Sequence, residues 1–169
     1  MNKPGVFGFA GYSGSGKTTL IEQLIPRFVE MGKTVSLIKH AHHTFDIDQP
    51  GKDSWRHREA GASEVLISSG GRWVLMHELR GQPEPTLEDQ LKALNPCDLV
   101  LIEGYKRASI PKLEVHRQSI GKPLLWPEDD NIVGIAADSR LQTGLPQLDI
   151  NNPIEVATFI LKYLDSNHE

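Results

Sequence analysis

Residues 7–24 read FGFAGYSGSGKTTLIEQL, and this stretch decides the fold. An apolar run of strand type precedes a glycine-rich turn, and apolar residues at helical spacing follow it. The turn, residues 11–18, matches G-x-x-x-x-G-K-[ST] at every fixed position, in the strand-to-helix context that the motif requires. Its glycines let several backbone N–H groups point at one anion, and the helix N-terminus adds partial positive charge. The stretch therefore predicts a phosphate-binding loop rather than a turn that only caps a helix.

The residue types in this loop predict separate roles. Lys17 is expected to reach the outer phosphates of a nucleotide, which makes it a catalytic candidate as well as a binding one. The hydroxyl of Thr18 is expected to ligate Mg²⁺. The candidate nucleotide-binding residues of the loop are Gly11, Tyr12, Ser13, Gly14, Ser15, Gly16, Lys17, Thr18 and Thr19.

The length of 169 residues indicates one domain, and the phosphate-binding loop makes residues 1–169 a single expected nucleotide-binding domain. The net charge of −4 does not favour nucleic-acid binding. A single cysteine, Cys97, excludes an internal disulfide and fits a reducing compartment. No apolar stretch is long enough to cross a bilayer, and the first strand leaves no room for a signal peptide. We therefore expect a cytoplasmic protein with no membrane association.

The rest of the chain alternates strand and helix patterns. Strands are expected at residues 6–10, 34–39, 64–68, 72–78, 98–104, 112–116 and 132–137. Helices are expected at residues 19–31, 54–60 and 86–94, and from 152 onward. The third and fourth strands flank a Gly-Gly turn and form an antiparallel hairpin. This order predicts an α/β fold of the P-loop NTPase type: a doubly wound, mainly parallel sheet with helices on both faces, plus the hairpin.

The strand DLVLIEG offers two acids as the partner of Mg²⁺. Four consecutive apolar residues indicate a strand buried on both faces, as in a parallel sheet. Asp98 and Glu103 are then about 17 Å apart, at opposite ends of the strand. Because a phosphate loop lies at the carboxyl ends of parallel strands, Glu103 is the candidate metal-binding and catalytic acid. Asp98 is expected to be structural or solvated.

Basic residues follow the second strand. Lys39 and His40, with His42 and His43, form either an electropositive rim for anionic ligands or a metal site. The spacing does not fit a compact structural zinc site. Lys39 and His40 are therefore candidate ligand-binding residues, and the metal interpretation stays open.

Three aspartates are further candidates. Asp46 and Asp48 could complete a metal site or join the Mg²⁺ shell, and Asp48 is the candidate ligand. The chain has no N-K-x-D tetrapeptide for guanine, so the residues alone do not choose between guanine and adenine. Asp138 follows a strand and could accept hydrogen bonds from a guanine base, or could cap a turn before Ser139.

Three motifs together resemble the family of molybdopterin-guanine dinucleotide biosynthesis adaptor proteins (MobB). They are GYSGSGKTTL, LIKHAHHTFDIDQPGKDSWRHREAGA and DLVLIEGYK, in this order, and the resemblance covers residues 6–137. It implies a GTP-binding protein of the molybdenum cofactor pathway, in which a separate guanylyltransferase (MobA) joins molybdopterin to GMP from GTP. It also implies that the protein assists this enzyme as a partner, hydrolyses GTP weakly and is a homodimer.

Other functions remain open at this point. A small-molecule P-loop kinase needs an acceptor pocket and usually an arginine-bearing lid. A metal-delivery GTPase would load its metal through His40, His42 and His43. A binding module without chemistry is the fourth possibility.

Overall fold

The computed structural model describes residues 3–41 and 45–167, and the chain divides into two compact units. The first unit comprises residues 1–42 and 94–169, and the second comprises residues 43–93. That residues 1–169 act as one nucleotide-binding domain stays a prediction.

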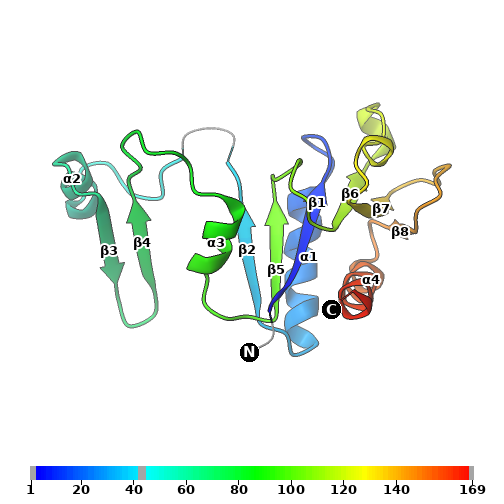
Figure 1. Cartoon of the computed structure of the whole chain (residues 1–169), viewed down its shortest axis with the longest axis horizontal. Helices are drawn as coiled ribbons and strands as arrows, with labels where there is room; N and C mark the ends of the chain where they lie inside the picture. The colour runs from blue at the N-terminus through cyan, green and yellow to red at the C-terminus, as the bar shows by residue number, and fades with distance from the viewer. Residues whose placement is uncertain (1–2, 42–44, 168–169) are drawn as a thin grey trace. The chain divides into compact units, whose positions relative to one another are not determined.

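The first unit is built on a six-stranded sheet in the order β2-β5-β1-β6-β7-β8, in which every neighbouring pair is parallel (Figure 1). The strands are β1 (Gly5–Ala10), β2 (Val35–Lys39), β5 (Leu99–Glu103), β6 (Lys112–His116), β7 (Ile132–Ala137) and β8 (Gln147–Asp149). Every residue of β5 is buried, as its apolar run predicted. The predicted α/β fold with a parallel sheet and a separate hairpin is confirmed.

Helices α1 (Lys17–Glu30) and α4 (Pro153–Ser166) enclose the core against one set of alternate strand residues. Phe7 of β1 and Leu101 of β5 are fully buried in this cluster together with Leu24, Phe28 and Ile160 of the two helices. Because strand side chains alternate between faces, residues two apart on one strand share this core. Helix α1 begins earlier than the apolar spacing predicted, because its first turn is part of the glycine-rich loop.

The other alternate positions of β6 carry buried charges. Lys112 Nζ lies 2.6 Å from Asp129 Oδ2, and the Lys112 side chain is 1% exposed. The carboxylate of Glu114 accepts the backbone N–H groups of Leu125 and Trp126 at 2.8 and 2.9 Å. These contacts fix the connection between β6 and β7, which contains the short 3₁₀ helices η1 (Gln118–Ile120) and η2 (Trp126–Glu128). Buried charges of this kind are stable only when they are paired or hydrogen-bonded.

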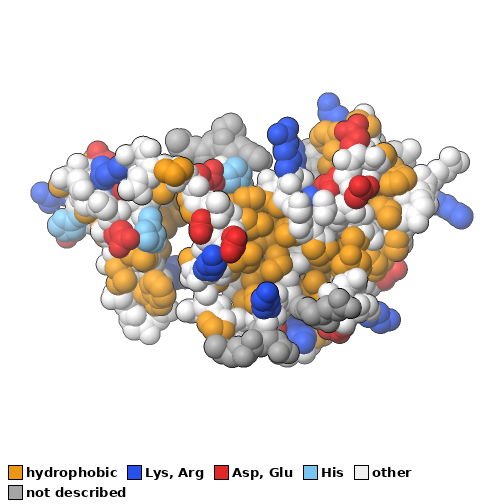
Figure 2. All heavy atoms as spheres, viewed as in Figure 1, with side chains coloured by type: hydrophobic (Ala, Val, Ile, Leu, Met, Phe, Trp, Pro, Cys, Tyr) orange, Lys and Arg blue, Asp and Glu red, His pale blue; other side chains and the backbone are white. Residues whose placement is uncertain are grey.

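The second unit contains α2 (Asp53–Glu59), β3 (Glu64–Ser68), β4 (Trp73–His77) and α3 (Leu87–Ala93). Strands β3 and β4 form the predicted antiparallel hairpin. Thr86 caps the start of α3, because Asp89 N–H donates to Thr86 Oγ1 at 3.2 Å and Thr86 Oγ1–H donates to Asp89 Oδ2 at 2.6 Å. Figure 2 shows hydrophobic side chains gathered on the hairpin, and the exposed ones include Leu66 and Trp73.

Arg58 of α2 holds the second unit together electrostatically. Its guanidinium contacts the carboxylates of Asp46 at 2.8 Å, Asp48 at 3.3 Å and Glu78 at 2.7 Å. The hydrogen bond from Arg58 holds the pKa of Asp46 below its usual range.

In the described part of the chain, none of the helices is both long and apolar enough to cross a membrane.

Candidate nucleotide site

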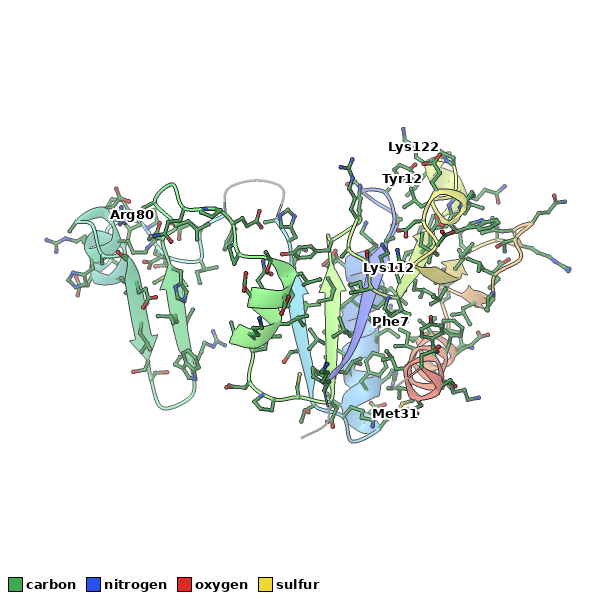
Figure 3. All side chains as sticks on the ribbon, viewed as in Figure 1. Phe7, Tyr12, Met31, Arg80, Lys112 and Lys122 are labelled. Atoms are coloured by element: carbon green, nitrogen blue, oxygen red, sulfur yellow. The ribbon has the colours of Figure 1, made fainter. Side chains whose placement is uncertain are left out.

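The phosphate loop connects β1 to α1 at the carboxyl end of the sheet. Gly16 occupies the N-cap of α1 with φ +91°, a left-handed conformation that a residue with a Cβ adopts only at a cost. The first turn of α1 contains no acidic side chain, so its N–H groups and partial positive charge are not offset locally. In Figure 3, Tyr12 of this loop lies beyond the same end of the sheet as Lys122. A glycine-rich loop that leads into a helix N-terminus with no acidic side chain in its first turn is an arrangement that binds phosphate.

Lys17 and Thr18 begin α1 and face two different groups. Lys17 Nζ donates hydrogen bonds to the backbone carbonyls of Gly11 and Tyr12, both at 2.9 Å. Thr18 Oγ1 donates to Glu103 Oε1 at 2.7 Å. The structure therefore brings together the predicted lysine, the predicted hydroxyl and the predicted acid.

Glu103 reaches this position because β5 runs parallel to β1 and β2. Phe9 and Lys39 are both in register with Glu103, so all three strands end at the same edge of the sheet. Glu103 is 6% exposed, and its Oε2 lies 3.3 Å from Lys39 Nζ. Asp98 is at the other end of β5, where its carboxylate accepts hydrogen bonds from Thr34 N–H and Thr34 Oγ1–H. Asp98 is exposed and hydrogen-bonded to Thr34, in agreement with a residue expected to be structural or solvated.

The pocket beside the loop carries excess positive charge. The residues that line a cavity of about 200 Å³ include three lysines, Lys17, Lys39 and Lys106, and one carboxylate, that of Glu103. Burial lowers the pKa of Lys17, and the nearby Lys106 and Lys39 lower it further, whereas Glu103 opposes the shift. Figure 2 shows Lys and Arg side chains projecting beyond the ends of β5 and β1. Such a pocket favours an anionic ligand.

The family profile described as "Molybdopterin guanine dinucleotide synthesis protein B" (MobB) matches residues 6–138. The chain is 43% identical to a molybdopterin-guanine dinucleotide biosynthesis adapter protein of Haemophilus influenzae, over 99% of this chain and 93% of that protein. It is 36% identical to the corresponding protein of Escherichia coli, over 96% of this chain and 95% of that protein. The chain belongs to the MobB family.

The fold agrees with a solved member of the MobB family. The crystal structure of a MobB homologue from Bacillus stearothermophilus superposes with a TM-score of 0.70 at 25% identity. The match covers 96% of this chain and 99% of that one. The resemblance predicted from three motifs in the sequence is therefore confirmed over nearly the whole chain.

The histidine segment is only partly described in this MobB chain. His40 lines the cavity beside Lys39, and its ring centroid lies 5.1 Å from that of Tyr105. His42 and His43 lie outside the described residues. Within residues 3–41 and 45–167, no three His, Cys, Asp or Glu side chains are grouped to hold a metal ion. Both interpretations of the histidine segment, an electropositive rim for anions and a metal site, therefore stay predictions.

Asp48 and Asp138 have protein partners of their own. The Asp48 carboxylate, in the second unit, accepts hydrogen bonds from Ser54 Oγ–H at 2.8 Å and Arg58 Nε–H at 3.3 Å. Asp138 Oδ1 accepts the N–H of Gln118 at 3.0 Å, and Oδ2 lies 3.7 Å from Arg117 Nη1. Their predicted roles toward Mg²⁺ and guanine stay predictions.

Two basic residues of this MobB site were not predicted from the sequence. Lys106 lines the cavity and its Nζ lies 6.0 Å from the centroid of the Tyr12 ring. Arg117 follows β6, and its Nε lies 3.2 Å from the point where a Cβ on Gly16 would stand. Both residues follow strands of the parallel sheet, so the rule that selected Glu103 could also have selected them.

We expect Gly104→Ala to destabilise the site because of backbone contact behind Glu103. Gly104 has φ +97°, and a Cβ there would stand 2.7 Å from the carbonyl oxygen of His40. The expected loss is about 2 kcal/mol or more in the free energy of unfolding, measured by chemical denaturation. Gly32→Ala is the matched control, since Gly32 has φ +76° but a Cβ there would meet nothing within 4 Å. Equal losses in the two variants would show that the contact with His40 does not matter.

Proposed function

We propose that the chain binds GTP with Mg²⁺ at the phosphate loop and acts as an adaptor in molybdopterin-guanine dinucleotide biosynthesis. The observation that carries this proposal is the 2.7 Å hydrogen bond from Thr18 Oγ1–H to Glu103 Oε1 at the mouth of a glycine-rich loop. It joins a hydroxyl from the helix start to an acid from the end of a neighbouring parallel strand. P-loop NTPases hold Mg²⁺ with the loop hydroxyl and the carboxylate of an aspartate, and Glu103 would supply the carboxylate here.

The donor set fits Mg²⁺ and a triphosphate. Magnesium prefers oxygen ligands, and Thr18 and Glu103 are the residues that would hold it, while the ion would offset the negative charge of the phosphates. Backbone N–H groups of residues 11–19 would bind the phosphates. Lys17 would exchange its two carbonyl partners for phosphate oxygens, which accept stronger, charge-assisted hydrogen bonds.

Lys39 and His40 form the outer edge of the proposed site. Lys39 is exposed and already lies 3.3 Å from Glu103, so it adds positive charge without filling the cavity. Both residues are positioned to attract phosphates of the nucleotide or of a pterin ligand. Attraction by exposed cations weakens as salt rises, because salt screens it.

Hydrolysis by the chain alone is expected to be weak. Glu103 is engaged by Thr18 and Lys39, which suits a metal-holding role better than proton abstraction from water. Fast P-loop GTPases also need a side chain that positions the attacking water. The proposed role is accordingly to hold GTP rather than to consume it.

The adaptor role follows from family membership. We propose that the chain partners a separate guanylyltransferase, MobA, which transfers GMP from GTP to the phosphate of molybdopterin with release of pyrophosphate. We also propose a homodimer. The exposed apolar side chains Leu66, Trp73 and Leu75 of the β3–β4 hairpin support a protein contact on the second unit.

A coupled assay tests this function. We expect the full chain to raise the initial rate at which the guanylyltransferase forms molybdopterin-guanine dinucleotide when GTP is limiting, because bound GTP is held at high local concentration. Lys17→Ala should remove the increase, whereas Lys162→Ala, an exposed lysine of α4, should keep it. An increase that survives Lys17→Ala would show that nucleotide binding by this chain is not what assists the enzyme.

A further inference from the structure

A second cavity lies at the carboxyl ends of β7 and β8, in the same unit as the phosphate loop. Its volume is about 480 Å³. Its polar lining comes from Asp138, Ser139, Arg140, Gln147, Asp149 and Asn151. In Figure 1 the loop between β7 and β8 extends from the end of the sheet, and Figure 2 shows a basic side chain on it. None of these residues takes part in the phosphate site described above.

Arg117 connects this cavity to the phosphate loop. Its Nε stands 3.2 Å from the Cβ position of Gly16 in the loop, and its Nη1 is 3.7 Å from Asp138 Oδ2 at the cavity. The sheet order places β7 two strands and β8 three strands from β1, which corresponds to about 10–14 Å. The α-phosphate and ribose of a nucleotide, bound by its outer phosphates at the loop, would span this separation.

The cavity is shaped by Gln147. Its Nε2–H donates to the carbonyl of Ser139 at 2.6 Å, and its Oε1 accepts the N–H of Leu141 at 2.9 Å. Both ends of this amide are used to hold the loop after β7 against the start of β8. Gln147 therefore fixes one wall of the cavity.

The two carboxylates of the cavity differ in their partners. Asp138 faces the N–H of Gln118 with one oxygen and the guanidinium of Arg117 with the other. Asp149 Oδ1 accepts the N–H and the Nδ2–H of Asn151 at 2.8 and 3.2 Å. This turn orients the Asp149 carboxylate, and no hydrogen bond to its Oδ2 is made among the residues that the structure describes. Asp149 is thus held in place with acceptor capacity left over.

We propose that this cavity is the base subsite and that Asp149 recognises a guanine base, an inference that rests on the proposed nucleotide function. Guanine presents two adjacent donors, N1–H and the 2-amino group, and a carboxylate accepts from both. Adenine presents the lone pair of N1 on the same edge, which a carboxylate repels. In this proposal Asp149 binds guanine as the aspartate of N-K-x-D does in other GTP-binding proteins, although Asp149 is not part of such a tetrapeptide.

The test changes the hydrogen-bonding groups of the protein, from carboxylate to amide, and those of the base, from guanine to xanthine or adenine. Full-length chain, Asp149→Asn and Asp138→Asn are titrated with GTP, ATP and xanthosine triphosphate in the presence of Mg²⁺. We expect Asp149→Asn to lose roughly tenfold or more in GTP affinity and to gain affinity for xanthosine triphosphate, since the new amide donates to the 2-oxo group that a carboxylate repels. Asp138→Asn should keep the preference for guanine over xanthine. Circular dichroism confirms that both variants fold.

The outcomes separate this inference from the function on which it rests. If the unmodified chain binds GTP but Asp149→Asn keeps its full preference for GTP, Asp149 does not read the base, and the proposed function stands. If Asp138→Asn produces the exchange instead, the reader is Asp138 and the inference is wrong. If the unmodified chain binds none of the three nucleotides, both the inference and the proposed function fail.

Discussion

Lys17→Ala is expected to weaken GTP binding by about 3 kcal/mol, roughly a hundredfold in Kd, because truncating one partner of a desolvated charge pair leaves the other unpaired. The Lys17 ammonium is half-buried in a cavity that two other lysines share, and burial lowers its pKa. A group held in this way has lost hydration that phosphate oxygens would replace. The loss should be measured by calorimetric titration in the presence of Mg²⁺.

The fold of Lys17→Ala should remain intact. Among the described residues, Lys17 donates to the carbonyls of Gly11 and Tyr12, and its side chain is not part of the apolar core. Lys162→Ala is the control, since it removes an exposed lysine from α4 at equal change in net charge. If a folded Lys17→Ala protein binds GTP as tightly as this control, GTP does not bind through Lys17 at the phosphate loop.

The second large effect is expected for Glu103→Gln. The neutral amide can still accept the hydrogen bond from Thr18, but it loses the charge that faces Lys39 and Mg²⁺. Altering a group that holds or orients a metal ligand costs roughly 10- to 100-fold in metal affinity. We therefore expect the Mg²⁺ concentration needed for half-maximal GTP binding to rise by that factor, with less change when Mg²⁺ is absent.

Asp98→Asn is the matched control on the same strand. Asp98 lies at the opposite end of β5, and its hydrogen bonds from Thr34 hold its pKa below the usual range. Such a depressed pKa stabilises the fold above the ordinary aspartate pKa, and this contribution is lost as the pH falls through the folded-state value. Asp98→Asn should reduce this acid-dependent stability and leave the Mg²⁺ requirement unchanged. Equal effects of the two variants on the Mg²⁺ requirement would mean that the role of Glu103 is misassigned.

Much of the phosphate site could be predicted from local sequence. The motif at residues 11–18 fixes the loop, because its glycines, lysine and threonine act within a few residues of one another. The apolar run before Glu103 predicts a buried parallel strand, and parallel strands finish at one edge. That single inference separated Glu103 from Asp98, and the register of β5 with β1 and β2 confirms it.

The sequence pointed to Asp138 as a candidate for the guanine base, but Asp149, the residue proposed for that role, could not be predicted in the same way. Strand β8 (Gln147–Asp149) has only three residues and follows Pro146, so it has too little alternating pattern to be predicted as a strand. Without β8, nothing in the sequence brings Asp149 near the end of β7. Arg117 directly follows a predicted strand, so its place at this edge of the sheet could have been predicted. Its contact with the phosphate loop depends on how β6 pairs with β1, and such a long-range contact leaves no local signal.

Calorimetric titration of the full chain with GTP, in Mg²⁺ and again in EDTA, tests the central claim most directly. We predict one GTP bound per chain, an affinity that falls when Mg²⁺ is removed, and loss of the binding heat in Lys17→Ala. GTP binding that is absent, or that is indifferent to both Mg²⁺ and Lys17, would contradict it.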